Sequence, residues 1–269
     1  MKHLNFLLSI FFFTIISVIA QQPSTSSIQV NTALIQKQEM TQNSLVKEVA
    51  FKNIGPTIMS GRVVDLDVNP QNPSEFYVGY ASGGVWHTVN NGTTFTPILD
   101  SSDTQNVGDI AVDWNSRTIW VGTGENNSSR SSYAGIGILK SSDNGKTWKK
   151  VGLNDSHHIG RILINPKNPD EVVVGVTGHL YSPNKERGIY KTTDGGNTWS
   201  QKLFVDEMSG IIDLAYAPDN FNVMFATSWT KDRKAWNFNG SGNNSAIYKS
   251  IDAGESWLKV TTEKSGFLT

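Results

Sequence analysis

The sequence of 269 residues contains no cysteine, and its charges almost cancel. Without cysteine the chain forms no disulfides, so its stability must come from a packed core or from a closed architecture. The 23 basic and 24 acidic residues give a formal charge of -1, which provides no overall field for binding nucleic acid or an anionic membrane. We therefore expect no nucleic-acid partner, and no motif in the sequence indicates a cofactor.

Long hydrophobic runs are also missing, apart from one at the N-terminus, MKHLNFLLSIFFFTIISVIA (residues 1–20). A basic start, an apolar stretch and a small residue before polar Gln21 are typical of a secretory signal peptide cleaved after Ala20. This predicts a secreted, periplasmic or cell-surface protein without membrane contact after cleavage. An uncleaved anchor is the alternative, although the run is barely long enough to span a bilayer. Residues 21–49, rich in Gln, Ser and Thr, indicate a polar linker with room for one short element.

One motif occurs four times, as SSDNGKTW, TTDGGNTW, SIDAGESW and the weaker TVNNGTTF. The copies lie about 50 residues apart, a period typical of one propeller blade. Three short runs rich in β-branched and aromatic residues precede each copy, and each predicts a strand. The region 51–269 therefore predicts an all-β fold, a β-propeller of four-stranded antiparallel blades. The predicted blades cover approximately residues 51–100, 101–152, 153–205 and 206–261, and a further blade starts at 262–269.

Four units are fewer than the roughly six to eight blades that commonly close a propeller. We therefore expect an incomplete propeller whose remaining blades belong to a C-terminal part that this sequence does not contain. The segment FKNIGPTI (51–58) is the candidate outer strand of such a missing last blade.

We expect the repeated motif to form a turn between the last two strands of each blade. Its Asp accepts backbone N–H groups, its Gly supplies a positive φ, and its Trp packs between blades. In the first copy an Asn and Phe95 replace the Asp and the Trp, and an amide cannot act as a catalytic carboxylate. The residues assigned to this structural role are Asn90, Gly92, Asp143, Gly145, Trp148, Asp194, Gly196, Trp199, Asp252, Gly254 and Trp257.

These residues resemble the Asp-box, or bacterial neuraminidase repeat, whose pattern is S/T-x-D-x-G-x-T/S-W. Within the Asp-box families, the segments FKNIGPTIMSGRV, VGTGENN and GIYKTTDGGNTW are similar to large exported proteins related to the sortilin-type propeller and to two-propeller xyloglucanases. The resemblance implies either a module that binds a peptide, protein or glycan, or a glycoside hydrolase. A fold alone does not decide between them.

The loops at the other end of the strands are the candidate ligand-binding region, because that end carries the long and variable connections. Exposed aromatic rings beside cationic donors suit carbohydrate rings or peptide side chains. Alternatively, Trp229 and Trp236 only pin a long loop to the propeller. The candidate ligand-binding residues are Trp229, Lys231, Arg233, Trp236 and Phe238 in the fourth unit, with Tyr181 and Arg187 in the third.

The resemblance to the xyloglucanases allows their catalytic motif to be compared with the matching residues of this sequence. Those enzymes carry a catalytic Asp in a first-blade motif like TDxGGxYRW, and the matching stretch here, YASGGVWH, has Ala81 at that position. Alanine cannot transfer a proton, so a xyloglucanase reaction is disfavoured. A sialidase is disfavoured because FKNIGP lacks the arginine that sialidases place in a similar early segment. Glu125, expected at the rim of the central channel, remains the candidate catalytic carboxylate.

Other charged residues lie near the same channel or on the connections between blades. Arg62, Asp109 and Arg161 follow the glycine that opens the first strand of units one to three, and we expect them to pair with neighbouring blades. The His157–His158 pair lacks the companion spacing of a metal site, so no metal is expected. The remaining connection residues could contribute an acid and a base, although surface loops are usually charged for solubility alone; they are Asp103, Asp155, Asp206 and Glu207.

Overall fold

The structure is a computed structural model that describes residues 24–49, 61–127, 132–234 and 236–261. Three predictions lie outside the described residues: the signal peptide at 1–20, the outer strand at 51–58 and the further blade at 262–269. Among the helices of the described ranges, none is long and apolar enough to span a membrane.

Four antiparallel sheets of four strands each make up the β region, which confirms the predicted fold class. Blade 1 contains β1 (Val63–Val68), β2 (Phe76–Tyr80), β3 (Gly84–Thr88) and β4 (Thr96–Pro97). Blade 2 contains β5 (Val107–Asp113), β6 (Thr118–Thr123), β7 (Ile138–Ser141) and β8 (Lys149–Lys150). Blade 3 contains β9 (Ile159–Asn165), β10 (Asn168–Val176), β11 (Gly188–Thr192) and β12 (Ser200–Leu203). Blade 4 contains β13 (Ser209–Ala217), β14 (Asn220–Thr230), β17 (Ala246–Ser250) and β18 (Leu258–Lys259), and a small hairpin pairs β15 (Asp232–Arg233) with β16 (Phe238–Asn239).

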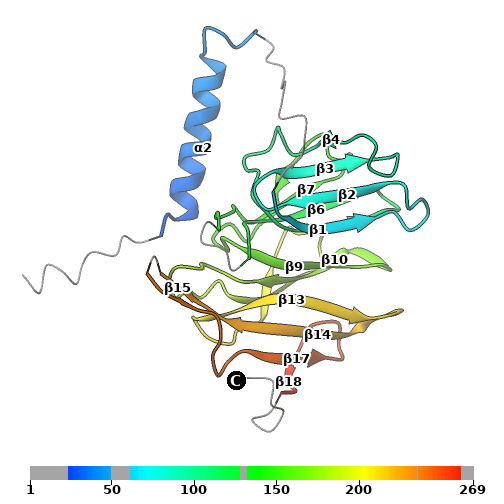
Figure 1. The fold of residues 1–269 in the computed structure, drawn as a ribbon, viewed down its shortest axis with the longest axis vertical. Coiled ribbons are helices and arrows are strands. Elements are labelled where there is room, and N and C mark those ends of the chain that lie inside the picture. Colours follow the sequence, from blue (N-terminus) through cyan, green and yellow to red (C-terminus); the bar gives the residue numbers. More distant parts are fainter. Residues whose placement is uncertain (1–23, 50–60, 128–131, 235, 262–269) are drawn as a thin grey trace, which may run out of the picture.

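The blades follow one another in an arc, from blade 1 at the top of Figure 1 to blade 4 at the bottom. The first strand of each blade contacts the first strand of the next, so β1, β5, β9 and β13 form the inner side of the arc. Each of the three apolar clusters lies between two consecutive blades: Tyr77 and Ile110 share one cluster, Trp120 and Ile159 the second, and Val173 and Ile211 the third. Burial between blades, rather than within one sheet, therefore provides most of the core.

The region predicted as a polar linker contains a longer helix than the one short element expected there. Residues Ser27–Gln42 form the 16-residue helix α2, whose start is a capping box made by Ser26 and Gln29. None of its residues is buried, so packing of an apolar face does not explain this helix. Its first turn is tied to the connection between β8 and β9, where the Ser27 backbone N–H and hydroxyl donate to Asp155 at 2.7 and 2.8 Å.

Candidate functional site

The two ends of the strands form two different faces of the arc. The Asp-box face carries the turns β1–β2 and β3–β4 and their equivalents in the other blades. The long-loop face carries the β2–β3 loop and its equivalents, the connections between blades, and the β15–β16 hairpin at the left of Figure 1.

The Asp-box motifs form identical closed turns in the three copies that have an aspartate. Asp143 accepts the Thr147 backbone N–H at 2.9 Å, the Thr147 hydroxyl at 2.6 Å and the Ser141 hydroxyl at 2.7 Å. The Thr147 hydrogen bonds, side chain first and then backbone, lower the pKa of Asp143 to about 2. Asn90 accepts the Thr94 N–H at 2.9 Å in the same way. Because an amide closes the same turn, the turn does not need a carboxylate.

Each of these turns contains two consecutive left-handed residues, where the motif alone indicated one. The glycine at the end of the pair has a φ of +83° at Gly145, and the residue before it, Asn144, has a φ of +62°. The box tryptophans donate to the preceding blade in two copies: Trp148 Nε1 lies 2.8 Å from the Ile98 carbonyl, and Trp199 Nε1 lies 2.7 Å from the Val151 carbonyl. In these two copies the motif therefore joins consecutive blades, whereas Trp257 donates to the Gly254 carbonyl of its own turn.

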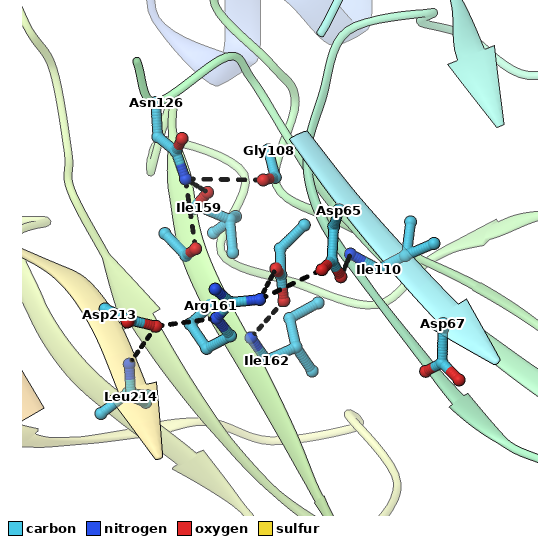
Figure 2. A network of polar contacts seen from close by, with 12 residues as sticks. Asp65, Asp67, Gly108, Ile110, Asn126, Ile159, Arg161, Ile162, Asp213 and Leu214 are labelled. Carbon is cyan, nitrogen blue, oxygen red and sulfur yellow. Dashed lines mark hydrogen bonds and ion pairs between the residues drawn. The ribbon is translucent and has the colours of Figure 1, made fainter. Parts of the chain in front are cut away.

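The inner strands meet at one arginine, shown in Figure 2. Arg161 on β9 pairs with Asp109 at 2.9 Å, with Asp65 at 3.3 Å and with Asp213 at 2.8 Å, so it contacts blades 1, 2 and 4. Asp109 also accepts the Ile162 N–H at 2.7 Å, and burial raises the pKa of its carboxyl well above the usual value. These contacts border a hollow of about 550 Å³ along the inner strands. All its ion pairs are between blades, so we assign this cluster to blade cohesion.

The strand register shows that Arg62 is not the structural equivalent of Asp109 and Arg161, although each of the three follows a glycine in the sequence. Asp65 pairs with Gly79, Asp109 with Gly122 and Arg161 with Gly175, so Asp65 rather than Arg62 occupies the place of Asp109 and Arg161. The reason is the β-bulge in each inner strand. In β1 it lies between Val63 and Asp65, and it shifts the pairing of the following residues with β2 relative to Gly61. The expected pairing with neighbouring blades is confirmed, since Arg62 in blade 1 pairs with Glu125 in blade 2.

Glu125 does not reach solvent at the rim of the channel. Its exposed fraction is 0%, and Oε1 accepts Arg62 Nε at 2.7 Å while its backbone N–H donates to the Tyr133 carbonyl at 3.0 Å. Oε2 has no hydrogen-bond partner among the described residues. A general acid must contact the substrate, so in this arrangement Glu125 is a buried anchor for Arg62.

Lys231 and Trp229 hold the fourth-unit loop in place. Lys231 is 1% exposed, its ammonium donates to the Asn127 carbonyl at 2.9 Å, and it lies 4.4 Å from the centre of the Trp229 ring. Burial, with the nearby charges of Arg233 and Arg187, lowers the pKa of Lys231 to about 8. Trp229 Nε1 donates to the Gly240 carbonyl at 2.8 Å. Trp229 therefore holds the long loop on the propeller, which is the alternative to ligand binding considered above. Lys231 connects blade 4 to blade 2.

The other members of the fourth-unit group point outward on the β15–β16 hairpin. Trp236 is 84% exposed and Phe238 is 39% exposed, while the Arg233 guanidinium lies 5.0 Å from the centre of the Phe238 ring. The hairpin is closed by the Lys234 N–H, which donates to the Asn237 carbonyl at 2.8 Å. Trp236 and Phe238 are thus accessible on this hairpin, and the half-buried Arg233 lies beside Phe238.

The two candidates from the third unit are separated by burial. Tyr181 is exposed, whereas Arg187 is 0% exposed and donates to the carbonyls of Met208 at 3.0 Å and His179 at 2.5 Å. Burial lowers the pKa of Arg187 to about 10. Arg187 holds the β10–β11 loop and offers no donor to solvent.

Three histidines gather where the β8–β9 connection meets the β10–β11 loop. The His157 ring stacks on His179 at 3.7 Å between ring centres, and His158 lies next to it. Burial lowers the pKa of His157 to about 4 and that of His158 to about 3, so both are neutral at pH 7. His179 was not foreseen, because only the fold brings it beside the pair. In the described part of the chain, no three His, Asp or Glu side chains are arranged to hold a metal ion.

These sheets, inner strands and Asp-box turns define the chain as a run of Asp-box β-propeller blades. A family model described as "Sortilin, neurotensin receptor 3" (Sortilin-Vps10) matches residues 137–268, just under half of the chain. A comparison with curated protein sequences gives no significant match.

Solved structures similar to the chain include three propeller enzymes. An ancestral GH74 enzyme has a TM-score of 0.56 and 21% identity, over 74% of this chain and 25% of that one. The GH74 enzyme of Niastella koreensis has a TM-score of 0.54 and 21% identity, over 77% of this chain and 31% of that one. The GH74 xyloglucanase of Xanthomonas campestris has a TM-score of 0.53 and 15% identity, over 73% of this chain and 29% of that one. The chain thus spans 25% to 31% of the length of these proteins, and at such identities the likeness shows the fold alone.

Proposed function

We propose that the chain is part of an exported Asp-box propeller that binds a peptide, protein or glycan through its long-loop face. The observation that carries this proposal is Trp236, a large ring that is 84% exposed on a hydrogen-bonded hairpin. Exposed rings of this kind are common anchors in binding interfaces, where their burial contributes most of the affinity.

The support below the hairpin strengthens the proposal. Trp229 bonds to Gly240 and Lys231 bonds to Asn127, so the base of the loop is held while Trp236 and Phe238 stay accessible. A loop held at its base loses less conformational entropy on binding than a free one, and such preorganisation raises affinity. Arg233 beside Phe238 adds a charged donor for carboxylates, carbonyls or hydroxyl groups.

The alternative, glycoside hydrolysis, finds less support. It requires two carboxylates on either side of one bond. The position of the expected first-blade carboxylate is Ala81, which is buried, and Glu125 is also buried. Hydrolysis of xyloglucan by the chain, lost in Glu125→Gln, would overturn the preference for binding.

The test uses glycan and peptide arrays probed with the wild-type chain, with Trp236→Ala and with Ile251→Ala. Ile251 is a matched control, because it is also an exposed apolar side chain but lies in an Asp-box turn. We expect Trp236→Ala to weaken binding about tenfold or more and Ile251→Ala to leave it unchanged. Absence of binding by the wild type, or binding that depends on Ile251 instead, would refute the proposal.

We also infer that a further blade covers the side of blade 1 that no described blade contacts. Ile110 and Ile162, at equivalent positions of blades 2 and 3, are each 3% exposed against the preceding blade, whereas Leu66 at that position of blade 1 is 51% exposed. Sedimentation of the chain alone should show self-association that decreases in Leu66→Lys. A strictly monomeric wild type would argue against an open side.

N-terminal sequencing of the exported protein, expected to begin at Gln21, tests the export.

A further inference from the structure

A small pocket lies on the long-loop face where three elements meet: the start of α2, the β8–β9 connection and the beginning of β11. Its volume is about 300 Å³. We call it the Ser156 pocket, and its polar lining consists of Ser27, Asn154, Asp155, Ser156, Glu186 and Tyr190. Neither the repeat nor the Trp236 hairpin explains this pocket.

Ser156 gives the first indication of a ligand. The residue is 2% exposed, and its hydroxyl has no hydrogen-bond partner among the described residues. Ser102 occupies the same place one blade earlier, since both serines donate their N–H to a leucine carbonyl three residues before, at 2.9 Å. The Ser102 hydroxyl donates to the Thr104 carbonyl at 2.6 Å. Since a buried hydroxyl without a partner is unfavourable, Ser156 is available for a group that enters the pocket.

The two carboxylates of the pocket, Asp155 and Glu186, differ in the number of partners that their oxygens already have. Both Asp155 oxygens accept from Ser27, and the positive end of α2 offsets part of their charge. Glu186 has only His179 near it, at 4.0 Å, among the ion pairs of the described residues. The pocket is therefore polar without being strongly anionic, and Glu186 remains a free acceptor.

Tyr190 on β11 supplies a donor to the lining. Its hydroxyl accepts Gln201 Nε2 at 3.1 Å, so the hydroxyl hydrogen stays available. Burial, with the Glu186 charge, raises the pKa of Tyr190 to about 12, which keeps the phenol protonated at neutral pH. The side chains of Ser156, Asn154 and Tyr190 can each donate and accept, and Glu186 accepts.

We propose that the Ser156 pocket binds one ring of a neutral sugar. Each sugar hydroxyl both donates and accepts, which matches a mixed lining of hydroxyls, an amide and a carboxylate. A volume of about 300 Å³ lies at the lower limit of ligand pockets and suits one ring rather than a chain. No lysine or arginine lines the pocket among the described residues, so an anionic ligand is not favoured. This proposal does not depend on ligand binding by the Trp236 hairpin.

The test is saturation-transfer NMR of the full chain with glucose, galactose, mannose and xylose as probes, and methylammonium as a cationic probe. At least one sugar should receive saturation from the wild type. Ser156→Ala should weaken that binding about tenfold, the loss expected for one hydrogen bond. Ser102→Ala, the matched control, and Trp236→Ala should leave the sugar affinity unchanged.

Stability provides the second readout. Ser156→Ala should melt at the wild-type temperature or above it, because it removes a buried group without a partner, whereas Ser102→Ala should melt lower. No transfer to any of the four sugars, equal affinity in Ser156→Ala, or binding of methylammonium in place of sugars would each overturn the proposal.

Discussion

The Asp-box face and the long-loop face differ in how completely their buried polar atoms are paired. In each box of blades 2 to 4, the aspartate accepts a backbone N–H and two hydroxyls of its own turn. Six buried side-chain polar atoms have no hydrogen-bond partner in the described part of the chain, and five of them belong to the long-loop face. Those five are Glu125 Oε2, Ser156 Oγ, His158 Nδ1, Asn184 Oδ1 and Arg187 Nε. The repeated turns are complete without a ligand, whereas the loops keep groups that a ligand or water can still satisfy.

The largest expected effect tests how the Asp-box turns join blades. A Cβ added at Gly145 would lie 2.8 Å from Ile98 of the preceding blade, at a φ of +83°. At Gly92, with a φ of +78°, the nearest atom would be 3.5 Å away, in Phe95 of the same turn. We expect Gly145→Ala to lower the free energy of unfolding by about 2 to 4 kcal/mol and Gly92→Ala by about 1 to 2. Equal losses in urea unfolding would show that the contact between blades contributes nothing.

Buried and exposed cations of the long-loop face provide the next comparison. Arg187→Ala removes three hydrogen bonds to loop carbonyls inside the protein, those to Met208, His179 and Ser182, so we expect a loss of about 2 to 3 kcal/mol. Arg233→Ala, on the accessible hairpin, should cost less than about 1 kcal/mol. Chemical denaturation of both variants checks this order. If Arg187→Ala kept the wild-type stability but lost ligand binding, Arg187 would be a ligand-binding residue and not a residue that holds the loop.

Acidification should affect the two faces in different pH ranges. The folded pKa values of His157 (about 4) and His158 (about 3) lie below the ordinary 6.5, so their contribution to stability is complete above pH 6.5 and is lost as the pH falls toward 4 and 3. The box carboxylates Asp143, Asp194 and Asp252 have pKa values of about 2, below the ordinary 3.8, so their contribution is lost only as the pH falls below 3.8.

His157→Asn separates these two ranges. Residue 157 has a φ of +56°, which asparagine tolerates, so the substitution should not strain the backbone. Urea midpoints measured from pH 7 to pH 2 should show a smaller slope between pH 6.5 and 4 in the variant, with the same slope below pH 4. A wild-type slope above pH 4 in the variant would contradict the assignment.

The smallest expected effect is that of Asp143→Asn. Asn90 already closes the first turn with an amide, so we expect a melting temperature within about 2 °C of the wild type and unchanged array binding. Asp143→Ala, which removes the acceptor of the Thr147 N–H, should melt lower than Asp143→Asn. Lost binding in Asp143→Asn with a normal melting curve would move function to the Asp-box face.

The sequence predicts the elements that repeat better than those that occur once. Four copies of one motif at a constant period predicted the sheets and the turns, because each copy corroborates the others. The alignment of blade 1 with blade 2 was wrong in one place, because Gly61 and Gly108 were taken as equivalent positions. The bulge in β1 lies at a different distance from Gly61 than the bulge in β5 does from Gly108. A bulge depends on strand pairing, which the spacing of glycines does not reveal.

The elements that occur once depend on contacts between distant segments. Burial of Arg187 and Lys231 follows from loop paths that bring Met208 and Asn127 to them. Likewise, the Ser156 pocket exists because Ser27 meets Asp155, which lies 128 positions away in the sequence. Helix α2 did have a local signal, since Ser26 and Gln29 fit the capping-box pattern.

The bonds from Trp148 to Ile98 and from Trp199 to Val151 have a direction, since each reaches from a later blade to an earlier one. During synthesis from the N-terminus, the carbonyl that each indole needs has already been made when the tryptophan appears. Blade 1 has Phe95 at this position, whose ring has no N–H to donate to a predecessor. Blades 2 and 3 can therefore each dock on a finished neighbour during synthesis, whereas Trp257 of blade 4 donates to the Gly254 carbonyl of its own turn and adds no such bond.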